Sequence, residues 1–190
     1  MYSKITVTRS CFPISWCNEV NQHMMSTVVP NPRLGKDGVR KCTVRSLAQG
    51  NSIYNEVFNI MMGYVKKHSI PLGVDIDGTI DSSIQHITYY PGDRVGWHND
   101  TKTVSHAIGD KHSLKVNRKL SMTLMLSDPT DYTGGEFLFD PNIKLPVGTL
   151  TAIDKGTALL FTSHSPHAVS PILTGQRNIF FIFCNGPEWR

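Results

Sequence analysis

The sequence has no long apolar run. Hydrophobic residues make up 39% of its 190 positions, but no stretch reaches the ~18 consecutive apolar residues of a membrane span. The opening segment, MYSKITVTRSCFPISW, also lacks the apolar core of a secretory signal. We therefore expect a cytoplasmic protein with no membrane partner, of a length that suits one domain with its own core.

The sequence has few cysteines and a small net charge. The four cysteines, at positions 11, 17, 42 and 184, form no C-x-x-C pair and match no zinc spacing. Scattered thiols suit a reducing compartment, and we expect them to be buried or neutral, without a metal-binding or redox role. The formal net charge of +4 is compatible with an acidic partner but too small to indicate nucleic-acid binding.

Short β-rich runs fill the second half of the chain, and turn-forming residues such as PGD, TGG, DPN and LTGQ separate them. Several short strands with such turns predict a sandwich, a jelly roll or a barrel. The runs are IQHITYY (84–90), KLSMTLMLS (119–127), GEFLF (135–139), ALLFTS (158–163) and NIFFIFC (178–184).

One helix is predicted in the first half. Residues 51–70, NSIYNEVFNIMMGYVKKHSI, place apolar side chains at helical spacing. Asn51 or Ser52 suits the N-cap, and Pro71 is expected to end the helix. Such a helix is expected to pack against the sheet.

A polar and basic segment, TKTVSHAIGDKHSLKVNR (101–118), interrupts the β pattern. We expect a long surface loop there. Two interpretations stay open: a lid that closes over an extended substrate through Lys102, Lys111, Lys115 and Arg118, or a solvated insertion.

A histidine and an aspartate two residues apart end the segment YYPGDRVGWHND. Side chains at this spacing on a strand point to one face, so His98 and Asp100 can share a metal ion. Iron(II) oxygenases use two histidines and one carboxylate, a donor set that zinc also accepts. The segment FTSHSPHAVSPILTGQR offers two candidates for the second histidine, His164 and His167.

Arg177 lies ten residues after His167 and opens the apolar run NIFFIFC. A hairpin at the Thr-Gly pair between them would return the chain beside the histidine strand. A buried guanidinium needs an anionic partner, and its planar fork fits a carboxylate through two parallel hydrogen bonds. The alternative is an arginine at the edge of a strand that points to water.

Taken in order, these motifs resemble the iron(II)- and 2-oxoglutarate-dependent dioxygenases, specifically the PKHD-type hydroxylases of the prolyl 4-hydroxylase-like group. YYPGDRVGWHND, LSMTLMLSDPTDYTGGEFLF and GTALLFTSHSPHAVSPILTGQR carry the resemblance, and VRKCTVRSL adds to it more weakly. It covers about residues 35–186. Val95 departs from the pattern, since the family usually has an aromatic residue there.

The resemblance implies an α+β, mainly β fold: a double-stranded β-helix, or jelly roll, with supporting N-terminal helices. It also implies a single dioxygenase domain over residues 1–190. Residues 1–82 would form supporting helices and strands, and residues 83–186 the jelly-roll core.

By the same resemblance, His98, Asp100 and His167 bind Fe(II). His167 has the family's spacing to the arginine, so His164 is expected near the site but not as a ligand. The Gly-Gly-Glu triplet that ends at Glu136 is expected to be structural, with its glycines in a tight turn or bulge.

Three residues are implied to hold 2-oxoglutarate. Arg177 would pair with its distal carboxylate, and Tyr89 and Thr123 would add hydrogen bonds. For Tyr89 the alternative is a core tyrosine bonded to the backbone, and for Thr123 it is an ordinary strand position.

The implied activity is hydroxylation of a substrate C–H bond, with O2 and 2-oxoglutarate converted to succinate and CO2, and with ascorbate as a further cofactor to consider. A peptidyl proline in a protein or peptide is the favoured substrate. The alternatives are another side chain, a free amino acid or a small molecule. A non-catalytic metal-binding interaction module and a zinc hydrolase are alternatives of other classes, and neither has a use for a cosubstrate arginine.

Overall fold

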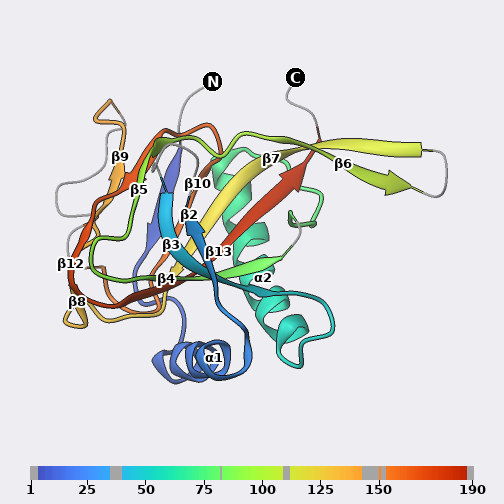
Figure 1. Cartoon of the computed structure of the whole chain (residues 1–190). Coiled ribbons are helices and arrows are strands. Elements are labelled where there is room, and N and C mark those ends of the chain that lie inside the picture. The colour runs from blue at the N-terminus through green and yellow to red at the C-terminus, as the bar shows by residue number, and fades with distance from the viewer. Residues whose placement is uncertain are drawn as a thin grey trace.

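The computed structural model has a mainly β fold (Figure 1). It describes residues 4–34, 40–81, 83–108, 112–142, 150 and 153–187. The helices are α1 (Ile14–Thr27) and α2 (Tyr54–Leu72). The strands are β1 (Ile5–Thr8), β2 (Asn31–Leu34), β3 (Arg40–Leu47), β4 (Ile84–Tyr89), β5 (Arg94–His98), β6 (Thr103–Ile108), β7 (His112–Met125), β8 (Tyr132–Gly134), β9 (Phe137–Phe139), β10 (Ala158–Thr162), β11 (His167–Val169), β12 (Ile172–Gly175) and β13 (Arg177–Gly186).

An 11-stranded sheet organises the molecule, in the order β1-β10-β7-β13-β4-β3-β5-β11-β9, with β2 beside β3 and β6 beside β7. The sheet curls over on itself. This brings Phe137 and Phe139 of β9 into contact with Phe161 of β10, a strand near the other end of that order. Strands β12 and β8 pair separately. The predicted jelly-roll fold is confirmed.

Both faces of the central strands are buried. Along β7, Leu120, Met122 and Leu124 pack with the core residues of the two helices. The residues between them face the interior of the curled sheet, where Met125 joins a second apolar core. This double burial explains why the central strands read as continuous apolar runs. The interior of the curled sheet is therefore mostly apolar and contains only a few buried polar side chains among the described residues.

Helix α2 confirms the predicted helix but not its ends. Ile53 is the N-cap residue, and Asn51 supports the start by accepting the N–H of Ile53 through Oδ1 at 3.1 Å. Pro71 lies inside the last turn, so the prediction that it ends the helix is wrong. Gly73 ends it: its φ of 62° turns the chain, and its N–H bonds the carbonyl of Ile70.

The basic segment 101–118 is not the predicted loop. Strand β6 pairs antiparallel with the first half of β7, from Thr103 opposite Asn117 to Ile108 opposite His112. Figure 1 shows this two-stranded ribbon reaching outward from the main body. Its polar composition concealed strands whose backbone groups are satisfied by pairing with each other.

Arg118, one of the four cations assigned to a lid, has partners in the main body of the protein. Arg118 forms an ion pair with Asp81 and its guanidinium carbon lies 3.5 Å from the ring centroid of Phe183, so it is held against the core. Lys111 and the side chain of Lys115 lie outside the described residues. The position of Arg118 therefore does not support the prediction that segment 101–118 is a substrate lid.

Residues 1–82 supply strands to the same sheet as residues 83–186. Strand β1 pairs with β10, and β3 lies between β4 and β5. The boundaries given above for a single domain stay a prediction. Neither described helix has the length and apolar character needed to cross a membrane, and a cytoplasmic location stays a prediction.

Candidate metal centre

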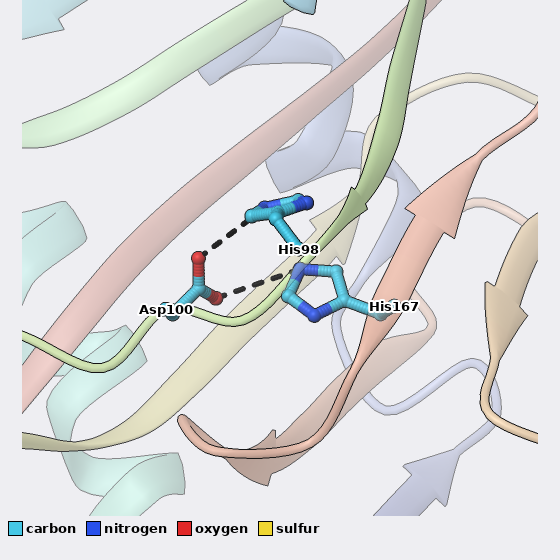
Figure 2. Close-up of side chains that lie close together, drawn as sticks. All are labelled: His98, Asp100 and His167. Carbon is cyan, nitrogen blue, oxygen red and sulfur yellow. Dashed lines mark ion pairs between the residues drawn. The ribbon is translucent and has the colours of Figure 1, made fainter. Parts of the chain in front are cut away.

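His98, Asp100 and His167 meet inside the curled sheet (Figure 2). His98 ends β5, Asp100 follows it, and His167 opens β11. The antiparallel pairing of β5 with β11 sets the two histidines directly opposite each other. One potential ligand atom from each of the three residues lies within 4.8 Å of the others, so the three side chains can share one ion.

Backbone carbonyls orient both imidazoles. Nδ1 of His98 donates to the carbonyl of Gly96 and Nδ1 of His167 to that of Ser165, each at 2.9 Å. Each Nε2 lies 3.5 Å from an oxygen of Asp100 and, when the ring is neutral, offers its lone pair to an ion. Metal-binding histidines typically have their other ring nitrogen fixed in this way.

The pKa shifts of Asp100 and His167 suit a cation, whereas that of His98 does not. Burial alone would raise the pKa of Asp100, but hydrogen bonds from His98 and Ser121 and the nearby His167 outweigh it and hold that pKa below its ordinary value. Burial lowers the pKa of His167, which favours the neutral imidazole that a metal requires. Burial also lowers the pKa of His98, but its hydrogen bond to Asp100 reverses this and the net shift is upward.

Ser121 is a further member of the centre that the sequence did not single out. Its hydroxyl donates to Oδ2 of Asp100 at 2.6 Å, and the residue is 0% exposed. The bond fixes the carboxylate and occupies one of its oxygens. The available signal was the alternation of Ser121 and Thr123 with apolar residues in LSMTLM, which places hydroxyls on one face of an otherwise apolar strand.

We expect Ser121→Ala to weaken Fe(II) binding by roughly 10-fold, the lower end of the range for partners that orient metal ligands. Removing the hydroxyl leaves a buried carboxylate oxygen without its donor and frees the side chain to rotate. Anaerobic Fe(II) titration of the metal-free protein measures this, with the exposed Ser46→Ala as the control. Equal affinity in the two variants would show that the hydroxyl does not orient the ligand.

Arg177 is 0% exposed, which rules out the alternative that it points to water. It opens β13 directly opposite Tyr89, and its guanidinium carbon lies 5.5 Å from that ring. Nη2 lies 3.5 Å from the sulfur of Met125, and Tyr132 lies beside the guanidinium, with its ring centroid 6.0 Å from the guanidinium carbon. Neither Nε nor Nη1 has a hydrogen-bond partner within the described part of the chain. A buried cation without an anion is costly, so this geometry calls for an anionic ligand.

The hairpin predicted at the Thr-Gly pair before Arg177 is not formed: β11 pairs with β5 and β9, and β13 pairs with β4 and β7. Glycines instead shape the turns on either side of the β12–β8 pair that precedes Arg177. At Gly175, with φ of 75°, an added Cβ would come within 2.0 Å of the Asp131 carbonyl. At Gly134, with φ of 74°, it would come within 2.3 Å of the Pro171 carbonyl. Only glycine therefore permits the close pairing of β12 with β8 that precedes Arg177. Glu136 is exposed and bonds Ser170, as a structural residue would.

Tyr89 and Thr123 lie on the same interior face. Tyr89 is 2% exposed, and burial raises its pKa to about 12, so its phenol stays neutral. Thr123 is 0% exposed, and its hydroxyl has no hydrogen-bond partner among the residues that the structure describes. An unsatisfied buried hydroxyl is a feature that a polar ligand would explain.

The remaining candidates lie outside the centre. His164 is not part of the three-residue group, and its Nε2 lies 3.4 Å from the hydroxyl of Thr162. Trp97 is 55% exposed and Asn99 is also exposed, and strand alternation places both on the face opposite to His98 and Asp100.

Comparison with known proteins gives the family. A model described as the 2OG-Fe(II) oxygenase superfamily matches residues 84–185, more than half of the chain and the part that contains the triad and Arg177. The chain therefore belongs to the 2OG-Fe(II) oxygenase superfamily, whose members depend on Fe(II), 2-oxoglutarate and O2. The donor set and the isolated buried arginine fit that family's cofactor and cosubstrate.

Three similar proteins add detail. The PKHD-type hydroxylase YbiX of Shigella boydii is 26% identical over 154 residues, covering 78% of this chain and 63% of that protein. The structure of a viral collagen prolyl hydroxylase from Paramecium Bursaria Chlorella virus-1, in a 2OG complex, has a TM-score of 0.66 at 16% identity and covers 96% of each chain. HygX of Streptomyces hygroscopicus, with nickel, 2-oxoglutarate and hygromycin B bound, has a TM-score of 0.58 at 14% identity and covers 98% of this chain and 85% of HygX.

These similarities support different conclusions about the fold and the function. At 16% and 14% identity, the two structures establish the fold alone. The chain spans less than two thirds of the length of the first curated relatives that it matches. Family membership follows from the matched residues, while activity and substrate require an argument from the site itself.

Proposed function

We propose that the protein is an Fe(II)- and 2-oxoglutarate-dependent hydroxylase. His98, Asp100 and His167 would hold Fe(II), and Arg177 would pair with the distal carboxylate of 2-oxoglutarate. The observation that carries the proposal is the fully buried Arg177. Two of its nitrogens have no hydrogen-bond partner among the described residues, and it lies in the interior that also contains the triad. A metal-binding interaction module or a zinc hydrolase would leave this charge without a partner.

The interior face of β7 supports this assignment. Ser121 bonds the triad carboxylate at one point of the strand, and Met125 contacts the guanidinium at another. The two positions are four residues apart, which corresponds to about 13 Å along a strand. A five-carbon dicarboxylate fits within that span, and the unsatisfied hydroxyl of Thr123 lies midway to bond it.

The chain's own contribution is binding, orientation and exclusion of water. When bound, iron and 2-oxoglutarate supply the oxidation of an unactivated C–H bond. His167 is sheltered by Phe137 and Phe161, whose ring centroids lie 5.5 and 4.7 Å from its own. Its ring is 3% exposed, whereas the side chain of His98 keeps 34% of its surface exposed. A substrate would therefore approach from the His98 side.

We propose a prolyl residue in a peptide as the substrate, supported by the PKHD-type relatives and by the prolyl hydroxylase among the structural neighbours. HygX, which binds hygromycin B, supports the alternative of a small molecule. Both substrate classes require the same cosubstrate chemistry.

Anaerobic titration of Fe(II) and then 2-oxoglutarate into the metal-free protein tests the proposal. We expect 2-oxoglutarate to bind only after the metal, and succinate to form when O2 is admitted. Peptides that contain proline should then gain the mass of one oxygen. If iron binds but 2-oxoglutarate does not, the triad is a metal site but the hydroxylase assignment is wrong.

A further inference from the structure

Arg40 is a second arginine that enters the interior. It begins β3 and lies directly opposite Val95 in the antiparallel pairing of β3 with β5. Directly opposite residues project to the same face. Val95 belongs to the interior core, as does Cys42, two residues along β3 from Arg40. Arg40 therefore points into the space that contains the triad and Arg177.

Arg40 forms no ion pair with the residues that the structure describes. Its Nε is buried without a hydrogen-bond partner among the described residues. Burial lowers the pKa of Arg40, but Cys42, Tyr89 and Asp100 outweigh this and raise it. Asp100 already serves the triad. Arg40 in turn lowers the pKa of both triad histidines, which shows that its charge reaches the metal centre.

The loaded site would have a surplus of positive charge. An iron(II) ion and the guanidinium groups of Arg40 and Arg177 carry four positive charges. Asp100 and doubly ionised 2-oxoglutarate carry three negative charges. One positive charge is left unbalanced in a partly desolvated space, and such a site favours one more anion.

The two arginines differ in access. Arg177 is wholly enclosed, whereas Arg40 is half-buried at the end of β3. Arg40 lies beside β5, whose His98 forms the exposed side of the triad. The enclosed arginine suits a cosubstrate that is covered during the reaction. A molecule that arrives from solvent meets Arg40.

We propose that Arg40 binds a carboxylate of the prime substrate, close to the carbon that is hydroxylated. The substrate class is then a prolyl unit with its own free carboxylate or with an acidic residue directly after it, rather than a neutral internal proline. This deepens the proposed function and rests on it. It makes Arg40 a specificity-determining residue, distinct from the cosubstrate arginine.

Binding of matched probes tests the assignment. Protein loaded with redox-inactive Mn(II), with and without 2-oxoglutarate, is titrated by calorimetry with N-acetyl-L-proline and with its amide. A second pair is the capped dipeptides proline–aspartate and proline–asparagine. We expect at least one carboxylate probe to bind 10-fold or more tightly than its neutral partner, and Arg40→Gln to abolish that difference. Arg40→Lys should retain part of it, because the charge remains.

Arg94→Gln is the matched control, since Arg94 lies on β5 next to Val95 but is exposed; it should keep the full preference. The proposal is overturned if the wild-type protein prefers neither carboxylate probe, or if Arg40→Gln weakens 2-oxoglutarate binding 10-fold or more, which would place Arg40 in the cosubstrate site. Failure of the wild-type protein to bind 2-oxoglutarate would instead contradict the proposed function and is measured separately.

Discussion

Arg177→Met is expected to lose affinity for 2-oxoglutarate by about 100-fold while the free protein becomes more stable. Truncating one partner of a buried, hydrogen-bonded charge pair costs roughly 2 to 5 kcal/mol of binding free energy, and each 1.4 kcal/mol is tenfold. The free protein responds in the opposite direction, because its guanidinium is 0% exposed with two unpaired nitrogens. Replacing buried charges by apolar groups of similar volume often stabilises by about 1 to 4 kcal/mol.

Two measurements check this prediction: calorimetric titration of the Mn(II)-loaded protein with 2-oxoglutarate, and urea unfolding of the metal-free protein. Arg94→Met on the exposed face is the control and should change neither quantity. A structural arginine would behave differently from a ligand-binding one. If Arg177→Met lowered the free energy of unfolding and left 2-oxoglutarate affinity intact, Arg177 would be a structural residue and the cosubstrate site would lie elsewhere.

The sequence contained the parts of the site that depend on local periodicity. The two-residue spacing of His98 and Asp100 puts them on one face of any strand. The Thr-Gly pair marks a tight turn before Arg177, but the strand pairing expected from it was wrong, because β13 pairs with β4 and β7 and not with β11. The alternating hydroxyls of β7 also follow from spacing alone. These features need no knowledge of which strands are neighbours, so they could be predicted together with the β-rich fold.

Other features depend on pairings between distant strands. Ser121 reaches Asp100 only because the sheet curls and brings the two segments together. Arg40 is an ordinary basic residue in the sequence, and its position opposite Val95 comes from the pairing of β3 with β5. The β6–β7 ribbon was missed for a related reason. Its sequence is mostly polar and lacks the regular apolar alternation from which a strand is predicted.

Substitution of His167, but not of the nearby His164, is expected to have the second large effect, on Fe(II) binding. We expect His167→Gln to weaken Fe(II) binding by about 100-fold and to abolish succinate formation, and His164→Gln to change neither. Binding free energies of structural metal sites run to roughly 10 kcal/mol or more, so one ligand of three contributes about 3 kcal/mol. Glutamine retains polarity and much of the ring's volume, which limits damage to the packing against Phe137 and Phe161.

The geometry explains why His167 and His164, only three residues apart, are expected to differ in metal binding. His167 lies opposite His98 in the β5–β11 pairing, with Nε2 3.5 Å from Asp100. His164 lies before β11 begins and has Nε2 3.4 Å from Thr162. Anaerobic Fe(II) titration, with thermal unfolding of the metal-free variants to confirm that both remain folded, decides the matter. Loss of iron in His164→Gln with retention in His167→Gln would show that β11 does not carry the ligand, and the cross-strand origin of the metal centre would then be wrong.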